Sequence, residues 1–246
     1  MDIFNLNMII NQIDFHHEVQ PITNLMSKQV FGFEFLLRTR HCQNPELLFK
    51  YAKKHDRHVD LDIKSIFKIL ETAKHESDNL QGFLLFINIC PSTLLDPAFH
   101  HNLHKFISVT HIKPSSVVLE ISEIHDGISL SMLKKTTAIL KKQGFLIALD
   151  DIGKGESTIK AVLEIEPNIG KVDRYFAKDI AQSSRKQKAI QCFLQFFGND
   201  IKMVLEGFES KEDLDSAIEL GVRFGQGYYL GKPNPFEYYL PNIEKN

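Results

Sequence analysis

Residues 146–151 read LIALDD, four apolar residues that are followed directly by two aspartates. A run of this kind, between a helical pattern that ends at Gly144 and the GKG segment at 153–155, is typical of a strand buried on both faces of a sheet. Such strands belong mostly to parallel sheets that are covered by helices. The stretch therefore predicts an α/β fold and places Asp150 and Asp151 at the carboxyl end of a strand.

Seven further short runs have β-type character, and helical periodicity fills most of the gaps between them. The runs are Glu18–Thr23, Val30–Arg38, Phe83–Cys90, Val117–Ser122, Ile169–Asp173, Ile201–Glu206 and Phe224–Tyr228. The helical patterns are clearest over Asp60–Lys74, Ile128–Gln143, Arg185–Phe197 and Lys211–Leu220. An open doubly wound sheet and a closed barrel both fit this alternation, and the number of strands favours the barrel.

The first two of these runs flank the polar stretch NLMSKQ at 24–29, which predicts a hairpin. Strands joined by a hairpin are antiparallel, whereas strands joined through a helix are parallel. We therefore expect a TIM-like (β/α)8 barrel in which one strand, from the N-terminal hairpin, runs antiparallel to the others.

The composition is that of an ordinary globular protein, with 43% hydrophobic and 24% charged residues among 246. No linker or low-complexity tract divides the chain, so we expect a single domain over 1–246 with its motif-bearing core at about 18–236. The formal net charge of −2 provides no electrostatic footprint for DNA or RNA.

Localisation is also suggested by the composition. No apolar run approaches the ~20 residues of a membrane span, and the first residues lack the features of a signal peptide. Cys42, Cys90 and Cys192 have no CxxC spacing, which indicates reduced thiols. We expect a cytoplasmic protein that does not bind a membrane.

Polar residues lie at or near the carboxyl ends of almost all the predicted strands. They are Glu34, Asn88, Glu120, Asp150, Asp151, Lys171, Asp173, Glu206 and Gln226. In an α/β barrel these positions converge on one face, where the active sites of this fold lie. A single acid at a strand end is usually a helix cap or a loop anchor, but so many at matching positions indicate a site.

The chemistry of this set favours hard divalent cations. Carboxylates and an amide oxygen, with no convergent histidine, suit Mg²⁺ or Mn²⁺ better than zinc. Asp150 beside Asp151 allows two ions with Asp150 bridging them, and ions ~3.5–4 Å apart can clamp both oxygens of a phosphoryl transfer. Lys171 would hold the attacking water or stabilise charge in the transition state.

At these residues the chain resembles the EAL family of cyclic di-GMP phosphodiesterases. The motifs that carry the resemblance are VQPI at 19–22, GFEFLLR at 32–38, INICP at 87–91, LEISE at 119–123, ALDDIGKGES at 148–157, KVD at 171–173, LEGFES at 205–210 and FGQGYYLGKPNP at 224–235. They extend over nearly the whole chain. The family has a modified TIM barrel with one antiparallel strand, and it hydrolyses cyclic di-GMP to linear pGpG with Mg²⁺ or Mn²⁺.

The resemblance also implies a role for each matching residue. The first metal would be bound by Glu34, Asn88, Glu120 and Asp150, and the second by Asp150, Asp151 and Glu206, directly or through water. Lys171 would position the nucleophilic water, and Glu209 and Gln226 would complete the water network or hold the metal ligands in place. Gln20, Arg38, Asp173 and Gln226 would contact the substrate, and Glu123 would anchor the loop after Asp151. A homodimer is expected, and a regulatory protein partner is possible.

The chain departs from the family pattern at a few positions. Phe35 stands in place of the alanine of the name-giving motif, and Gly170 replaces an apolar residue before Lys171. Ile152, Lys154 and Glu156 replace the usual Phe, Thr and aromatic residue of the loop after the aspartate pair. The loop motivates an alternative, a catalytically weak or inactive EAL-like protein that binds cyclic di-GMP or a partner protein. A barrel enzyme for another phosphodiester is a third hypothesis.

Overall fold

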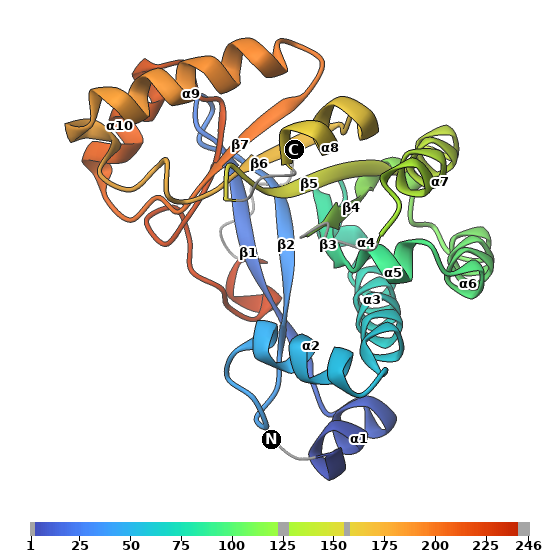
Figure 1. The fold of residues 1–246 in the computed structure, drawn as a ribbon. Helices are drawn as coiled ribbons and strands as arrows, with labels where there is room; N and C mark the ends of the chain where they lie inside the picture. Colours follow the sequence, from blue (N-terminus) through green and yellow to red (C-terminus); the bar gives the residue numbers. More distant parts are fainter. Residues whose placement is uncertain (1–2, 123–127, 155–157, 241–246) are drawn as a thin grey trace.

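The computed structural model describes residues 3–122, 128–154 and 158–240 and shows a closed barrel of eight strands (Figure 1). The strands follow one another around the barrel in chain order. They are β1 (His16–Asn24), β2 (Val30–Arg38), β3 (Leu84–Ile89), β4 (Val117–Ile121), β5 (Leu146–Ile152), β6 (Ile169–Val172), β7 (Lys202–Glu206) and β8 (Phe224–Gln226).

Strand β1 is antiparallel to both of its neighbours, β2 and β8, and each of the other neighbouring pairs is parallel. The predicted barrel with one antiparallel strand from an N-terminal hairpin is therefore confirmed. The eight predicted strands are all present, with ends that differ by a few residues at most.

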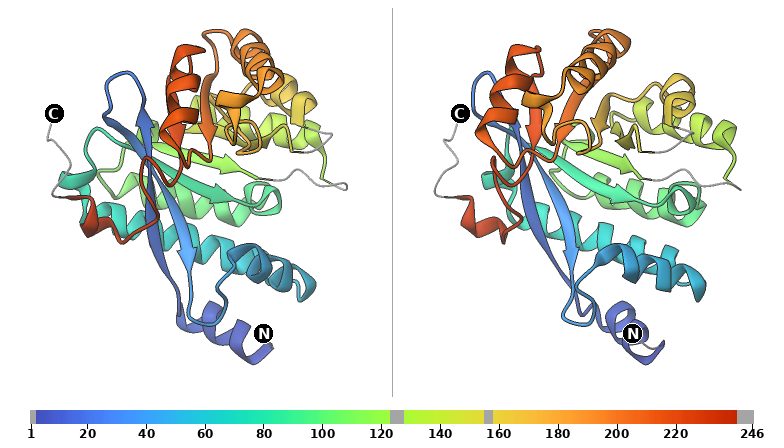
Figure 2. Two further views of the ribbon diagram at one scale, coloured as in Figure 1. Left: turned by 90° about the vertical axis from the view of Figure 1, so that its left-hand side faces the viewer. Right: turned by 60° about the vertical axis from the view of Figure 1, so that its left-hand side comes forward.

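Helices surround the barrel, and the two long strands of the hairpin extend beyond it toward the N-terminus (Figures 1 and 2). The helices are α1 (Ile3–Gln12), α2 (Pro45–Lys54), α3 (His58–His75), α4 (Ser77–Leu80), α5 (Pro91–Leu94), α6 (Pro97–Ser108), α7 (Leu130–Lys142), α8 (Thr158–Ile165), α9 (Ser184–Phe197) and α10 (Lys211–Glu219). Short 3₁₀ turns lie at Pro114–Ser116, Ile180–Gln182 and Phe236–Tyr238. No helix in the described part of the chain is long and apolar enough to span a membrane.

Local sequence explains where several helices begin. Asn44, Ser129, Ser183 and Ser210 each accept a backbone N–H bond in the first turn of the helix that follows, which satisfies one of the donors left open there. Pro45 adds a fixed φ at the first position of α2. Helices α1, α2, α4, α5 and α8 were not predicted, because each has ten residues or fewer and so repeats the apolar spacing over too few turns.

Two layers of apolar side chains hold the barrel. The larger layer lies between the strands and the surrounding helices, and a smaller one fills the barrel interior with Ile22, Phe86, Val118, Ala148, Ile169 and Val204. Gly32 allows this interior to close, because a Cβ there would lie 2.9 Å from the ring of Phe86 and 2.5 Å from the carbonyl oxygen of Leu84. The interior layer forms the floor on which the candidate site rests.

A third, separate apolar cluster joins α1 and α2 to the far end of the hairpin. Leu6, Ile9 and Ile10 of α1 pack with Leu48 of α2 and Leu61 of α3. Figure 1 shows α1 and α2 beside the extended end of β1 and β2, far from α9 and α10. This cluster fixes the position of α2 along one side of the barrel mouth.

Candidate active site

The site is built by strand alternation on the floor of the barrel. Asn88, Glu120, Asp150, Lys171 and Glu206 each follow an interior apolar residue by two positions along the strand. Side chains two apart in a strand point to the same face, so these polar groups form the next inward layer. Register pairs Asn88 with Glu120 and Glu206 with Gln226, which aligns them across neighbouring strands.

Lys171 lies at the centre of this layer and is 1% exposed. Its Nζ lies 3.0 Å from Glu34 Oε2, 2.6 Å from Glu120 Oε1 and 2.7 Å from Glu206 Oε1. Asp150 Oδ1 is farther from Nζ, at 3.7 Å. One ammonium therefore serves carboxylates from four different strands.

Amide side chains fix the orientation of Glu34. Asn88 Nδ2 donates to Glu34 Oε1 at 2.9 Å, and Gln226 Nε2 donates to Glu34 Oε2 at 2.7 Å. Gln226 also lies 3.3 Å from Gln20 Oε1, and Gln20 Nε2 donates to the carbonyl oxygen of Gly231. Because Asn88 uses its nitrogen toward Glu34, its amide oxygen is left for another partner.

The cluster holds four carboxyl groups around one ammonium, more acids than Lys171 alone can compensate. Burial raises the pKa of Glu206 to about 8, and it also raises the pKa values of Glu120 and Asp150. Burial acts in the same direction on Glu34, but Lys171 and the amide donors outweigh it and lower the pKa of that carboxyl. The four carboxylates together hold the pKa of Lys171 well above its usual value against the effect of burial. A buried excess of carboxylate is costly unless a cation compensates it.

The arrangement of oxygens fits a divalent cation. Asp150, Asp151 and Glu206 each offer an oxygen, and these atoms lie within 4.8 Å of one another. Glu120 Oε2 and Asp150 Oδ1 are buried and have no hydrogen-bond partner among the described residues. An all-oxygen set of this kind suits hard cations.

Both aspartates of LIALDD reach the site because β5 ends irregularly. Plain alternation would send Asp151 to the opposite face from Asp150. The register with β6 shifts between Leu149 and Ile152, and Asp151 has a left-handed φ of 55°. This conformation costs about 1–3 kcal/mol for a residue other than glycine, and it brings the two adjacent carboxylates to the same side.

The residues predicted from the sequence do not all meet in this cluster. Arg38 lines the adjoining cavity and pairs with Glu18 at 2.7 Å, and Asp173 is buried with Oδ1 accepting the backbone N–H of Tyr175. Glu209 is exposed, and its side chain has no hydrogen bond or ion pair with any residue the structure describes. Glu123, the predicted loop anchor, lies outside the described residues, as does Glu156 of the atypical loop.

Two of the sequence departures leave the cluster intact. Phe35 belongs to the layer between the strands and the helices, so its ring does not displace Glu34. Gly170 leaves space for the ring of Phe197 on α9, which would lie 2.9 Å from a Cβ at this position. Lys154 differs, because its Nζ lies 2.7 Å from Asp151 Oδ2 and so neutralises a carboxylate of the candidate metal site.

The cavity wall beside the acid cluster was not predicted from the sequence. A cavity of about 780 Å³ is lined by Glu34, Asn88, Asp150 and Asp151 on one side and by residues of α2 on the other. The Asn44–Pro45 pair, an N-cap followed by a proline at the first helical position, is the signal that predicts a helix here.

Residues 5–233 match the family model for the EAL domain. The chain belongs to the EAL domain family. It is 31% identical over 229 residues to the probable cyclic di-GMP phosphodiesterase PdeI of Escherichia coli K12, an alignment that covers 88% of this chain and 28% of PdeI. It is 29% identical over 234 residues to the cyclic di-GMP phosphodiesterase RocR of Pseudomonas aeruginosa, which covers 92% of this chain and 59% of RocR. The chain therefore spans less than two thirds of the length of these relatives.

Solved structures of EAL proteins share the fold. An EAL domain protein from Listeria monocytogenes EGD-e superposes with a TM-score of 0.84 at 22% identity, covering 98% of this chain and 97% of its own. Klebsiella pneumoniae BlrP1, in a complex with manganese and cyclic di-GMP, has a TM-score of 0.78 at 25% identity and covers 87% of this chain and 55% of its own. The barrel with one antiparallel strand is thus the fold of this EAL chain.

Proposed function

We propose that this chain is a metal-dependent phosphodiesterase that opens cyclic di-GMP to linear pGpG in the cytoplasm of a bacterial cell. The observation that carries the proposal is the buried ring of carboxylates around Lys171, with Asp150, Asp151 and Glu206 close enough to share a cation. The names of the relatives PdeI and RocR, and the complex of BlrP1 with cyclic di-GMP, support the choice of substrate.

In this proposal two ions, Mg²⁺ or Mn²⁺, bind at the acid cluster. Glu34, Asn88, Glu120 and Asp150 would hold the first, and Asp150, Asp151 and Glu206 the second. When bound, they supply charge that stabilises the transition state and activates the attacking water. Two ions would also balance the carboxylate charge that Lys171 alone does not neutralise.

The residues of the chain then orient the reaction. Lys171 directs its Nζ at the centre of the ring, where it holds the nucleophilic water against the phosphorus. The water oxygen forms a bond to phosphorus while the bond from phosphorus to one ribose oxygen breaks, and that oxygen leaves with a proton. Gln226 and Asn88 keep Glu34 fixed, and Arg38 on the cavity wall contacts a substrate phosphate oxygen. Gln20, which accepts a hydrogen bond from Gln226, and Asp173 would contact the substrate, and Glu209 would complete the water network once substrate and cations are bound.

The test is direct. Purified protein is incubated with cyclic di-GMP and Mg²⁺ or Mn²⁺, and pGpG is followed by chromatography. We expect pGpG from the wild type and none from Glu34→Ala, since that variant loses a cation ligand. No pGpG from folded wild-type protein with either ion would reject the proposal, and full turnover by Glu34→Ala would reject the assignment of the site.

The contact between Lys154 and Asp151 supports a second candidate function. An ammonium 2.7 Å from this carboxylate competes with a cation for the same oxygen. The chain would then be a weak or inactive EAL protein that binds cyclic di-GMP, or a regulatory protein partner, as a homodimer. Calorimetry that shows binding of cyclic di-GMP without any pGpG would favour this function.

A further inference from the structure

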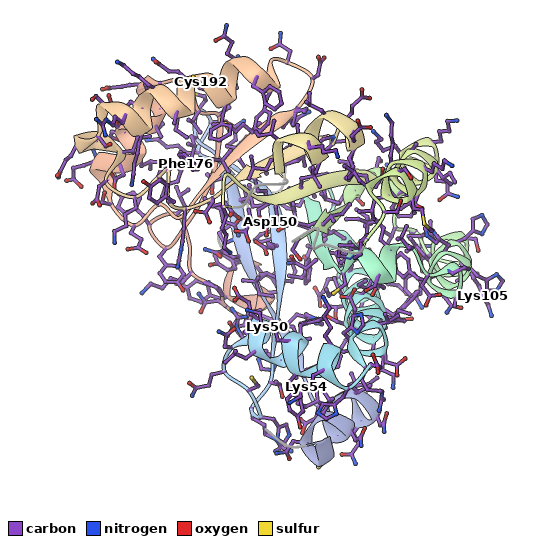
Figure 3. The ribbon with its side chains drawn as sticks, in the orientation of Figure 1. Lys50, Lys54, Lys105, Asp150, Phe176 and Cys192 are labelled. Atoms are coloured by element: carbon purple, nitrogen blue, oxygen red, sulfur yellow. The ribbon has the colours of Figure 1, made fainter. Side chains whose placement is uncertain are left out.

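The cavity beside the acid cluster has a second wall of different chemistry. Its volume is about 780 Å³, and it extends from Asp150 at the barrel mouth to α2. Figure 3 shows Lys50 on the side of α2 that faces Asp150, whereas Lys54 lies on the other side of the helix. The cavity thus lies between a ring of carboxylates and a helix that presents lysine.

One face of α2 forms this wall. Glu46, Phe49, Lys50 and Lys53 all line the cavity, and their spacing of three, four and seven residues places them on the same side of a helix. Leu48 and Ala52 lie on the opposite side and are buried against α1 and α3. Since that packing fixes how α2 is rotated, both lysines are held toward the cavity.

These lysines are the cations of the wall whose charge is not neutralised. Among the described residues, neither Lys50 nor Lys53 forms an ion pair, whereas Arg38, which also lines the cavity, pairs with Glu18. His58 also lines the cavity, and its pKa is lowered by burial and then by the charge of Lys53. An anion that enters the cavity therefore finds its free positive charge on α2.

We propose that Lys50 and Lys53 bind the phosphate of the cyclic dinucleotide that is not cleaved, while the other phosphate lies at the acid cluster. The inference rests on the proposed function and names the residues that hold the second half of its substrate. A cyclic dinucleotide carries two phosphates on opposite sides of one ring. The lysines of α2 lie at one end of the cavity, and the candidate metal site at Asp150 and Asp151 lies at the other. Phe49, between the lysines and Glu46 on the same face, gives a base or ribose an apolar surface to contact.

The experiment compares two double variants with the same change of charge. Lys50→Ala/Lys53→Ala removes the wall lysines, and Lys54→Ala/Lys105→Ala removes exposed lysines that do not line the cavity. The kcat/KM of each variant is measured for cyclic di-GMP and for bis(p-nitrophenyl) phosphate, which has a single phosphodiester. Circular dichroism and thermal melting show that both variants are folded.

We expect the wall variant to lose roughly tenfold in kcat/KM for cyclic di-GMP relative to bis(p-nitrophenyl) phosphate, mainly through KM. The loss should shrink with added salt, since exposed charges are screened, and Lys50→Arg/Lys53→Arg should recover most of it. An unchanged substrate ratio, or the same loss in the control variant, would overturn the proposal.

Calorimetry separates this inference from the proposed function. If the wild type binds cyclic di-GMP without cleaving it, the proposed activity fails, and the affinities of the two double variants still decide the inference. Weaker binding by the wall variant alone supports it. Equal affinities, or no binding by the wild type at roughly 100-fold the concentration of protein, overturn it.

Discussion

Lys171 illustrates how one side chain can organise a charged site. Its ammonium is buried and contacts Glu34, Glu120 and Glu206 from three strands. Removing one partner of a buried charge network is costly because the charges left behind lose their compensation. Lys171 is thus both a candidate catalytic group and a structural cation.

We predict that Lys171→Met abolishes hydrolysis and lowers the free energy of unfolding by about 3 kcal/mol at neutral pH in metal-free buffer. Urea unfolding followed by circular dichroism measures the change in stability. Lys142→Met, at an exposed position of α7, is the control and should change stability by less than about 0.5 kcal/mol. If Lys171→Met has the same free energy of unfolding as the control variant, the central role of this lysine is contradicted.

Lys154 is the residue of the atypical loop that contacts the acid cluster directly, through Asp151. Its ion pair with Asp151 is half exposed, so it contributes little to stability but does occupy a carboxylate oxygen of the cluster. We predict that Lys154→Thr binds Mn²⁺ or Mg²⁺ roughly two- to fivefold more tightly in calorimetric titrations. Lys160→Thr on α8 is the control, because it makes the same change of charge away from the cluster. If this variant gains as much affinity for the cation, the effect comes from net charge and not from the contact with Asp151.

At the scale of elements, the turn after β3 depends on a buried acid from a neighbouring helix. Asp62 of α3 is 2% exposed, and its Oδ2 accepts the backbone N–H of Cys90 at 2.8 Å. This bond holds the chain two residues beyond Asn88, which donates to Glu34 in the site. Burial raises the pKa of Asp62 from 3.8 to about 6, although the hydrogen bond from the backbone N–H of Cys90 opposes the shift.

The pH dependence that follows has a definite sign. Because the folded-state pKa of Asp62 is above its unfolded value, the folded protein binds the proton more tightly, and stability is lost as pH rises through about 6. Between about pH 5 and about pH 7 this loss is roughly 1 kcal/mol, and it should be absent in Asp62→Asn. Urea unfolding at the two pH values tests this, with Asp78→Asn on the surface of α4 as control. A parallel pH profile for wild type and Asp62→Asn would contradict the buried-acid argument.

At the scale of the molecule, closure of the barrel creates the site from distant parts of the chain. Gln226 donates to Glu34, and these residues are 192 positions apart. Lys171 alone does not compensate the four carboxyl groups gathered in this way. Binding of a divalent cation should therefore stabilise the whole barrel by mass action.

We predict that Mg²⁺ or Mn²⁺ at about 100 times its Kd raises the melting temperature by roughly 5–10 °C, since such binding contributes about 2.7 kcal/mol. Differential scanning fluorimetry with and without EDTA measures the shift. Asp150→Asn keeps the shape of the side chain but removes its charge, and it should lose most of the shift. A shift of the same size in this variant would place the cation elsewhere.

The strands, the barrel and most of the acid cluster follow from the sequence alone. Each β-type run buries its own apolar residues and carries its own polar residue near the end, and both features are local. The antiparallel β1 follows from the polar stretch between two strands, because a short connection leaves the chain no other direction. The motifs indicated the EAL family for the same reason, since each is a short run of residues that stays together in the sequence.

Other features depend on contacts between distant elements, and the sequence did not reveal them. The sequence placed Asp151 beside Asp150 in the site, but it did not predict the left-handed residue and the register shift against β6 that bring both carboxylates to the same side. The wall of the cavity depends on α2, whose rotation is set by packing against α1 and α3. The partners of Arg38 and Asp62 likewise come from other elements, Glu18 of β1 for Arg38 and the turn after β3 for Asp62. A one-dimensional pattern records which side chains are present, but only packing in three dimensions sets which charges meet and which remain free.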